Sequence, residues 1–545
     1  MNSIEAIEEN LKFQVLEVEN VVRLTFRLLN DADIDLLEKV ASRDDYVDNL
    51  KNIIENQCFS QIHGAGTLEE KDIRTIRSAH VICVNLERIA DFCVSIAQQT
   101  EYLIEFAILH QSNYAEMVSL IQTSLAKILP VLHRRDLSGA LIICRSEQQL
   151  DALYKENFDW LMAKMRSGEY IENLITTLFI FRYLERIGDS LLNIGEALIF
   201  AAIGERIKIE QFDTVQETLS QSGLAPSWAA GNFKSILGSR SGCQIGQVVA
   251  LEEGEAATRG IFKEGRKSKI RREKENIERW EKVMPGLAPA ILAYHENGSK
   301  ASLLCEFLPG RTLDALILTE NEQTVDRSLA LLQATIGEIW TQTKADRSAA
   351  IDYMDQLKNR LETIRRVHPE FSRSPQGIEE LAIPSTEVLI ERCAQIAKDH
   401  PAPFTVLNHG DFNANNILYD ADRHAVHYVD LYRTLEADYV QDASVFLVSN
   451  FRMPVFEKRL RMRLNEVIER FYDFFYDFAR AHRDATFELR MALALARSFY
   501  TSTRFELNPL FARDMFTRAH YLMEKVEDHG GGTQGFVLPR KVLFY

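Results

Sequence analysis

A chain of 545 residues is too long for one hydrophobic core, and its 46% hydrophobic and 26% charged residues are typical of globular proteins, so at least two domains are expected. Its formal net charge of −16 opposes the basic surface that phosphate neutralisation requires, which excludes nucleic acid as an expected partner. No stretch reaches the ~18 uninterrupted apolar residues of a membrane span, and no basic, then apolar leader begins the chain, so we expect a cytoplasmic protein with no membrane span.

From Ile4 to Ile209 the sequence predicts long amphipathic helices. Apolar residues recur at i, i+3, i+4 and i+7, and few Gly or Pro residues interrupt them. The expected helices lie at about 4–29, 34–57, 68–109, 113–129, 137–165 and 170–203. Six such helices, three in each half, can bury their apolar faces as an up-and-down bundle.

Four acidic pairs with i, i+4 spacing recur along these helices. Glu87 and Asp91 in NLERIADFC correspond to Glu185 and Asp189 in YLERIGDSL, roughly one hundred residues later, and this correspondence indicates an internal repeat. An earlier pair in each half completes the set, namely Asp44, Asp48, Glu147 and Asp151. Any single pair is typical of a solvated surface, but like charges on one helix face repel, so the recurrence favours a shared role.

The shared role that we expect is hard-metal binding. Carboxylate oxygens without cysteine ligands suit Mg, Mn, Ca or Fe(III), and the facing helices of a bundle bring carboxylates together. LERIADFC and LERIGDSLLNIGEA make residues 1–212 resemble PhoU, a family of all-α phosphate-uptake regulators built from two three-helix repeats. The resemblance implies a metal cluster and a regulatory role, with a phosphate transporter, a sensor kinase or a second copy of the chain as candidate partners.

A change of composition marks the end of the helical half. In LSQSGLAPSWAAGN, residues 219–232, Gly, Ser, Pro and Ala replace the periodic pattern, and we assign 213–232 as a linker. Beyond it, FKSILG, QVVALEE, GIFKEG and SLLCEFL predict short strands, whereas the sequence from about 321 onward is mainly helical. A small β-rich lobe and a larger helical lobe are therefore expected over 233–530, with 531–545 as a C-terminal tail.

The clearest chemical motif is HGDFNANN at residues 409–416, followed by the strand-like ILY and by HYVD. Phosphoryl transfer to a hydroxyl needs a carboxylate that orients the hydroxyl and accepts its proton, for which we expect Asp411. It also needs oxygen ligands for Mg²⁺, for which we expect Asn416 and Asp430. HGD alone is equally consistent with a turn that Asp411 caps, but the order of the residues upstream favours catalysis.

A lysine and a glutamate upstream predict a nucleotide site. Lys263 in IFKEG is expected to contact the α- and β-phosphates of the nucleotide. Glu273, on the helix that follows, is expected to hold Lys263 in place, with Glu275 as the alternative.

Backbone groups complete the predicted nucleotide site. Gly238, Gly242 and Gly246 predict an irregular glycine-containing loop whose N–H groups approach the phosphates. Backbone groups from Glu306 to Leu308, in the CEFLPG segment between the two lobes, are expected to bind adenine.

LNHGDFNANNIL, HYVD, RREKENIERW and LLCEFLPG make residues 233–530 resemble the aminoglycoside phosphotransferase and choline kinase group. The resemblance implies a bilobal, protein-kinase-like α+β fold, ATP or GTP as donor, two Mg²⁺ ions and a small-molecule hydroxyl as acceptor. It also implies that Asp438 and Asp442 brace the catalytic loop. The sequence departs from the group's pattern after Asp430, where Leu-Tyr-Arg follows.

The expected function is therefore ATP-dependent phosphoryl transfer to a small-molecule hydroxyl, regulated by a metal- or phosphate-responsive helical domain. The alternative is a signalling scaffold that binds nucleotide with little or no catalysis. Lys263, Asp411, Asn416 and Asp430 are all present, and their presence favours the enzyme.

Overall fold

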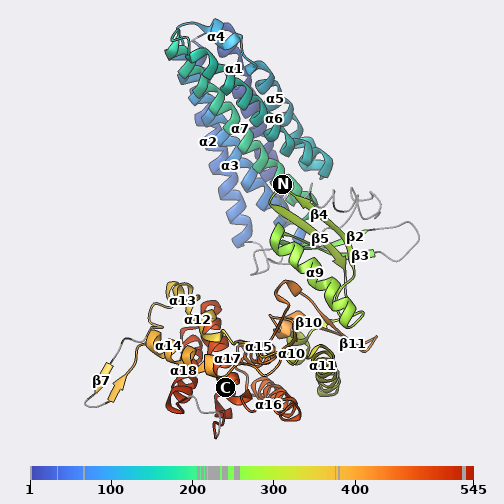
Figure 1. The fold of residues 1–545 in the computed structure, drawn as a ribbon. Coiled ribbons are helices and arrows are strands. Elements are labelled where there is room, and N and C mark those ends of the chain that lie inside the picture. Colours follow the sequence, from blue (N-terminus) through green and yellow to red (C-terminus); the bar gives the residue numbers. More distant parts are fainter. Residues whose placement is uncertain are drawn as a thin grey trace. The chain divides into compact units, whose positions relative to one another are not determined.

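The computed structural model of the chain divides into two units, Met1–Glu264 and Gly265–Tyr545 (Figure 1). The structure describes residues 3–204 except 34 and 65–67, residues 209, 214, 218, 234, 235 and 244–250, and residues 258–545 except 373, 375, 379, 380 and 531–534. The linker expected at 213–232 therefore lies outside the described residues, apart from positions 214 and 218.

Helices, the majority of them long, make up most of the described part of residues 3–204 in the first unit. They are α1 (Ser3–Asp31), α2 (Leu36–Gly64), α3 (Glu70–Gln99), the 3₁₀ turn η1 (Thr100–Tyr102), α4 (Phe106–His110), α5 (Tyr114–Arg134), α6 (Leu137–Met165) and α7 (Ile171–Ile203). The first three helices pack against one another, as do α5, α6 and α7, and α3 also packs along α7. Ile7, Leu11, Val15 and Val18 of α1 are buried at helical spacing in the common core. The expected bundle of two three-helix repeats is confirmed.

The helix expected at 68–109 is interrupted, because a buried side chain from the second repeat stabilises a break. α3 ends at Gln99. Beyond it, Ile104 N donates to Asn173 Oδ1 at 2.9 Å, and Asn173 Nδ2 donates to Glu105 O at 3.1 Å. Asn173 lies on α7, far away in sequence, so local periodicity contains no signal for this break.

Of the described helices, α5 alone is long and apolar enough to cross a membrane by length and composition. Met117, Ile121 and Leu125 of this helix are buried in the core of the bundle. Packing against α1, α6 and α7 therefore accounts for its apolar character.

Antiparallel strands overlap the segments in which the sequence predicts strands, although the second of them begins at Gln244, ahead of QVVALEE. They are β1 (Lys234–Ser235), β2 (Gln244–Ala250), β3 (Thr258–Arg266), β4 (Ile291–Asn297) and β5 (Lys300–Glu306). β2 pairs with β1 and β3, and β4 pairs with β5 as a hairpin. Helix α9 (Lys267–Val283) follows β3, and its Trp280 donates through Nε1 to Thr434 Oγ1 at 2.8 Å. This bond ties α9 to the segment that follows the catalytic loop.

The rest of the second unit is mainly helical. Its helices are α10 (Leu313–Thr319), α11 (Glu322–Thr343), α12 (Tyr353–Lys358), α13 (Leu361–Val367), α14 (Thr386–Asp399), α15 (Val440–Phe451), α16 (Lys458–Ala481), α17 (Phe487–Ser502) and α18 (Pro509–Asp528), with the 3₁₀ turns η3 (Ala414–Asn416), η4 (Leu431–Arg433), η5 (Thr503–Phe505) and η6 (Arg540–Leu543). The fold is therefore the expected kinase-like α+β arrangement. The residues assigned to the tail include η6, whose Val542 and Leu543 are buried.

Short strands frame the catalytic motif. They are β6 (Arg311–Thr312), β7 (Gln376–Ile378), β8 (Leu381–Ile383), β9 (Val406–Asn408), β10 (Ile417–Asp420), β11 (Ala425–Tyr428) and β12 (Leu435–Ala437). β10 pairs with β11 and β6, and β9 pairs with β12, in both cases antiparallel. The segment 409–416 therefore connects β9 of one small sheet to β10 of another.

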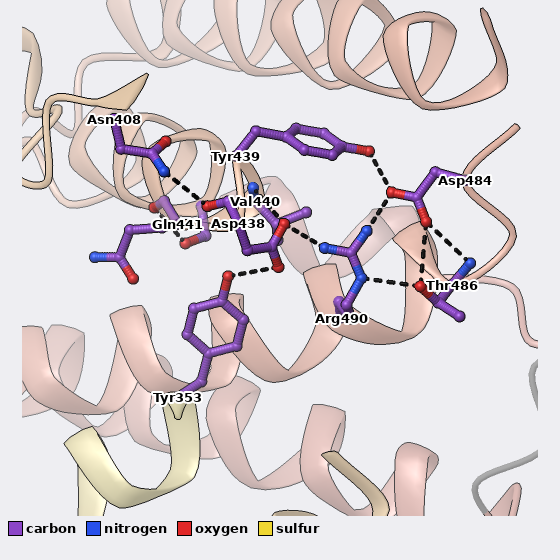
Figure 2. Close-up of polar contacts among 10 residues, drawn as sticks. Tyr353, Asn408, Asp438, Tyr439, Val440, Gln441, Asp484, Thr486 and Arg490 are labelled. Atoms are coloured by element: carbon purple, nitrogen blue, oxygen red, sulfur yellow. Dashed lines mark hydrogen bonds and ion pairs between the residues drawn. The ribbon is translucent and has the colours of Figure 1, made fainter. Parts of the chain in front are cut away.

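A buried arginine anchors the segment that follows the catalytic motif to α17 (Figure 2). Arg490 is fully buried and forms ion pairs with the buried carboxylates of Asp438 and Asp484. Tyr353 donates its hydroxyl to Asp438 Oδ2 at 2.9 Å, and Tyr439 donates to Asp484 Oδ2 at 2.7 Å. Burial alone would lower the pKa of Arg490, but Asp438 and Asp484 raise it above its ordinary value, so the guanidinium stays charged.

We expect Arg490→Met to destabilise the second unit by about 3–5 kcal/mol, because two carboxylates would remain buried without their cation. Denaturant unfolding of the full chain measures the loss. Arg480→Met, which removes an exposed arginine from α16, is the matched control and should change stability by less than about 0.5 kcal/mol. Equal stability of the two variants would show that the ion pairs contribute nothing to the fold.

Candidate active site

The β10–β11 hairpin brings two expected metal ligands together. Ile417 pairs with Tyr428 across the hairpin, and Val429 N donates to Asn416 O at 3.0 Å just beyond that pair. Asn416 and Asp430 therefore lie next to each other at the end of the hairpin. Asp411 is also close, because Asn416 Nδ2 donates to Asp411 O at 2.8 Å.

The carboxylate of Asp411 is oriented from two sides. Asn413 Nδ2 donates to its Oδ1 at 2.6 Å, and Arg433 Nη1 lies 3.4 Å from its Oδ2. The side chain remains 23% exposed, so a hydroxyl compound can reach it. A positioned, partly exposed carboxylate is the group that a general base for a hydroxyl requires.

His409 is a structural imidazole rather than a second base. It is 1% exposed, and burial lowers its pKa although the nearby Asp411 opposes the shift. The hydrogen bonds assign the neutral tautomer with the proton on Nε2, which donates to Val429 O at 3.0 Å. Nδ1 then accepts from Asp411 N at 3.3 Å, which links the base to the β11 end of the hairpin.

One buried carboxylate holds the start of the catalytic loop. Asp442 accepts from His409 N at 2.6 Å and from Gly410 N at 2.9 Å. Burial raises the pKa of Asp442 to about 7, although these two hydrogen bonds oppose the shift. Gly410 has a φ of +82°, and a Cβ there would lie 2.1 Å from Arg433 O, so only glycine fits. The bracing that the sequence predicted for Asp442 is confirmed.

Asp438 braces the loop differently, through its backbone. Asn408 Nδ2 donates to Asp438 O at 3.1 Å, and the Asp438 side chain accepts from Val440 N and pairs with Arg490 (Figure 2). The residue therefore links the strand before the loop to α17.

Asn416 and Asp430 fit the metal role expected of them. Because Asn416 uses its Nδ2 on Asp411 O, its amide oxygen is the atom that can bind a cation. Asp430 has a φ of +63°, a conformation that is uncommon outside glycine and that recurs at functional sites. A carboxylate and an amide oxygen at one point suit Mg²⁺.

The predicted phosphate-binding lysine and its glutamate occupy different units. Lys263 lies on β3 opposite Ile245 and is 9% exposed. Glu273 lies on α9 and is 2% exposed, whereas Glu275 on the same helix is exposed. A carboxylate is rarely buried without a functional or ionic reason, so Glu273 is the better candidate of the two.

The predicted glycine loop is wrong at Gly246. That residue pairs with Phe262 within the β2–β3 ladder, because the strand begins at Gln244 and continues through the glycine. Gly238 and Gly242 lie outside the described residues.

The expected adenine-binding segment follows β5. Glu306 is the last residue of that strand, and its N–H donates to Ala290 O at 2.8 Å, so this amide is not available to adenine. Leu308 is buried two residues later. We therefore expect adenine to contact the other backbone groups of the segment.

The first set of acidic pairs converges between α2 and α3. Burial and the neighbouring Asp91, Asp48 and Glu87 raise the pKa of Asp44 to about 6. A lysine compensates this negative charge, because Lys51 Nζ lies 2.6 Å from Glu87 Oε1 and 3.5 Å from Asp48 Oδ1.

The second set lies on α6 and α7 and has its own cation. Burial raises the pKa of Asp151, and Asp189 raises it further. Arg182 Nη1 lies 2.7 Å from Glu185 Oε2 on the same helix, so an arginine within α7 compensates this set, whereas Lys51 compensates the first set from α2. Glu147 of α6 is half-buried.

The acidic sets do not form a metal centre in this structure. Among the described residues, no group of three or more His, Cys, Asp or Glu side chains is arranged to hold a metal ion. The repeat brings the carboxylates together as expected, but Lys51 and Arg182 supply positive charge, which the sequence interpretation did not consider. Their i, i+3 spacing from Asp48 and Glu185 is the signal that would have identified them.

Two family matches cover most of the chain. The PhoU domain family matches residues 16–100 and 114–198, and the phosphotransferase enzyme family matches residues 261–482. The phosphate-specific transport system accessory protein PhoU homolog of Clostridium acetobutylicum is 29% identical over 189 residues, which cover 33% of this chain and 84% of that protein.

Solved structures match the two parts separately. PhoU from Pseudomonas aeruginosa is 25% identical and covers 37% of this chain and 98% of its own, with a TM-score of 0.34. An aminoglycoside-3'-phosphotransferase of type VIII is 18% identical and covers 47% of this chain and 92% of its own, with a TM-score of 0.31. The chain therefore carries a PhoU domain of two repeats in its N-terminal part, followed by a domain of the phosphotransferase enzyme family.

Proposed function

We propose that the chain is a kinase that transfers the γ-phosphoryl group of ATP to a hydroxyl of a small molecule, under the control of its PhoU domain. The observation that carries the proposal is the convergence of Asp411, Asn416 and Asp430 at the end of the β10–β11 hairpin. This set combines a base for the acceptor with oxygen ligands for the magnesium of the donor.

In the proposed reaction, Asp411 orients the acceptor hydroxyl and takes its proton. The hydroxyl oxygen forms a bond to the γ-phosphorus as the bond to the β-phosphate oxygen breaks, and ADP leaves. Asn416 and Asp430 would hold Mg²⁺, which neutralises charge on the phosphates when it is bound. Asn413 keeps Asp411 in position through the bond to Oδ1.

Lys263 is proposed to contact the phosphates of ATP or GTP, with Glu273 as its supporting carboxylate. The burial of both side chains supports these roles. The segment from Glu306 to Leu308 is proposed to contact the base of the nucleotide.

The helical domain is proposed to regulate the kinase in response to phosphate supply. Several curated relatives of this part are named as accessory proteins of a phosphate-specific transport system, which supports a phosphate transporter or its sensor kinase as a partner. A cytoplasmic location and a homodimer are part of the same proposal.

A second candidate function is a scaffold that binds nucleotide without catalysis. The ion pair between Arg433 and Asp411 favours it, because the guanidinium occupies one oxygen of the base. Measured phosphoryl transfer decides between the two candidates.

We expect Asp411→Asn to lower kcat by about 10²–10⁴-fold while leaving the affinity for Mg-ATP unchanged, because the variant loses only the base. ADP release in the presence of an acceptor gives kcat, and calorimetry gives the affinity. Asp422→Asn, an exposed position in the turn of the same hairpin, should behave as wild type. Wild-type turnover by Asp411→Asn would refute the assignment, and absence of turnover by the wild type would favour the scaffold.

Asp430→Ala should weaken Mg-ATP binding itself, because a ligand of the metal is lost. Calorimetric titration with Mg-ATP should give a Kd at least about tenfold higher than for wild type. The Kd for ATP in excess EDTA should differ less between the two proteins. An unchanged Kd for Mg-ATP would contradict the metal role of Asp430.

Asp44→Asn should stabilise the helical domain more at pH 7.5 than at pH 4.5. The pKa of Asp44 is raised from 3.8 to about 6 in the folded state, so its folded form binds more protons, and stability falls as the pH rises from about 3.8 through about 6. Calorimetric melting of the full chain at both pH values measures the difference, with the exposed Asp159→Asn as control.

Wild type and Asp44→Asn also test the hard-metal binding that the sequence predicts. If Mg²⁺ or Mn²⁺ binds at Asp44, the ion should raise the Tm of wild type at pH 7.5 and should raise that of Asp44→Asn less. Equal responses would leave Lys51 as the cation that compensates this cluster.

A further inference from the structure

Five arginines from different elements contact the proposed base or its loop, or interact electrostatically with the base or with one another. They are Arg360 at the start of α13, Arg433 in η4, Arg452 after α15, Arg497 in α17 and Arg504 in η5. All of them belong to the second unit. Only Arg433 lies beside a recognisable motif in the sequence, because long stretches of chain separate the other four from it.

Two of the arginines contact the catalytic loop directly. Arg433 Nη1 lies 3.4 Å from Asp411 Oδ2. Arg452 Nη2 donates to Asn413 Oδ1 at 3.2 Å, and the amide of Asn413 in turn donates to Asp411. Two guanidiniums therefore lie at or next to Asp411, the residue that is proposed to receive the acceptor hydroxyl.

Arg504 has a donor that an anion could satisfy. It is partly buried, and within the described part of the chain its Nε is buried without a hydrogen-bond partner. Its guanidinium lies over the ring of Phe505, 4.3 Å from the centroid. Burial and repulsion from Arg360, Arg433 and Arg452 lower the pKa of Arg504 to about 10, although Asp411 opposes the shift.

Carboxylates offset only part of this charge among the described residues. Asp411 lies in an ion pair with Arg433, on which Asp430 also acts, and Asp352 and Asp442 act on the buried Arg497. Arg497 Nη2 donates to neutral Gln441 Oε1 at 3.0 Å. Arg490 in the same unit shows the opposite arrangement, because two carboxylates neutralise it. A guanidinium cluster in which a buried donor, here Arg504 Nε, has no partner among the described residues is typical of sites that bind a carboxylate or a phosphate.

We propose that the phosphoryl acceptor is an anionic hydroxyl compound whose carboxylate or phosphate group binds Arg360, Arg452 and Arg504 while its hydroxyl faces Asp411. This inference rests on the proposed kinase function and specifies its substrate class. The bound anion also competes with Asp411 for Arg433, so that its binding frees Oδ2 to accept the hydroxyl proton. An amine-bearing acceptor is disfavoured at this site, since the five guanidiniums repel it.

Two matched series of acceptors test the proposal with the full chain and Mg-ATP. One series is glucose, gluconate, glucose 6-phosphate and glucosamine, and the other is glycerol, glycerate, glycerol 3-phosphate and 3-amino-1,2-propanediol. ADP release gives kcat/KM for each compound, and a thermal shift with Mg-ADP gives binding even where no turnover occurs. The carboxylate and phosphate members distinguish the two kinds of anion.

In at least one series we expect the anionic members to bind or react better than the neutral and amine members. Arg504→Gln and Arg452→Gln should raise KM or Kd for the anion by about tenfold or more, while the KM for Mg-ATP stays unchanged. Unchanged Mg-ATP affinity also shows that the variants fold. Arg513→Gln on α18, an exposed arginine, is the control and should match wild type.

Three results would overturn the inference. Turnover that favours neutral or amine compounds would refute the anionic acceptor while leaving the kinase function intact. Variants that raise the KM for Mg-ATP instead would assign the arginines to the nucleotide. Absence of both turnover and an anion-dependent thermal shift would refute the anion site. A thermal shift that occurs without turnover, and that is lost in Arg504→Gln, would support the anion site and refute the kinase function.

Discussion

The proposed active site depends on the bonds that one buried carboxylate makes to backbone N–H groups. Asp442 accepts from His409 N and Gly410 N and thereby fixes the turn from which Asp411 projects. Gly410 makes this turn sterically feasible, because its Cβ-free backbone packs against Arg433 O. The same turn places Asp411 beside Asn416, so the bonds of Asp442 position both the proposed base and a proposed metal ligand. Loss of the Asp442 carboxylate would leave two buried N–H groups without acceptors.

Charge compensation distinguishes the structural parts of the chain from the part that is proposed to bind substrate. Arg490 is neutralised by two carboxylates, and the acidic sets of the helical bundle receive Lys51 and Arg182. Carboxylates offset only part of the charge of the arginines around Asp411, and Arg504 keeps a buried Nε without a partner among the described residues. A folded protein tolerates uncompensated charge where a ligand neutralises it, which is why this cluster carries information about the acceptor.

Much of the fold could be predicted because its signals are local. The i, i+3, i+4 pattern predicts the helices of the bundle, and runs of β-branched and apolar residues predict strands that overlap β1, β2, β3 and β5. The predictions failed where a distant residue decides the outcome. Asn173 accepts from Ile104 N and ends the third helix early, and pairing with Phe262 draws Gly246 into a strand instead of a phosphate loop.

The sequence by itself determined the chemical groups of the site, since the spacing of Asp411 and Asn416 within one short loop reflects the reach of side chains around a phosphate. Only the tertiary structure decided which charges surround those groups. Asp442 meets the loop from 32 residues away, and Arg452 reaches it from the end of α15. These contacts depend on how the helices pack against one another. A periodic sequence pattern indicates which face of a helix is buried, but it does not indicate which residues that face contacts.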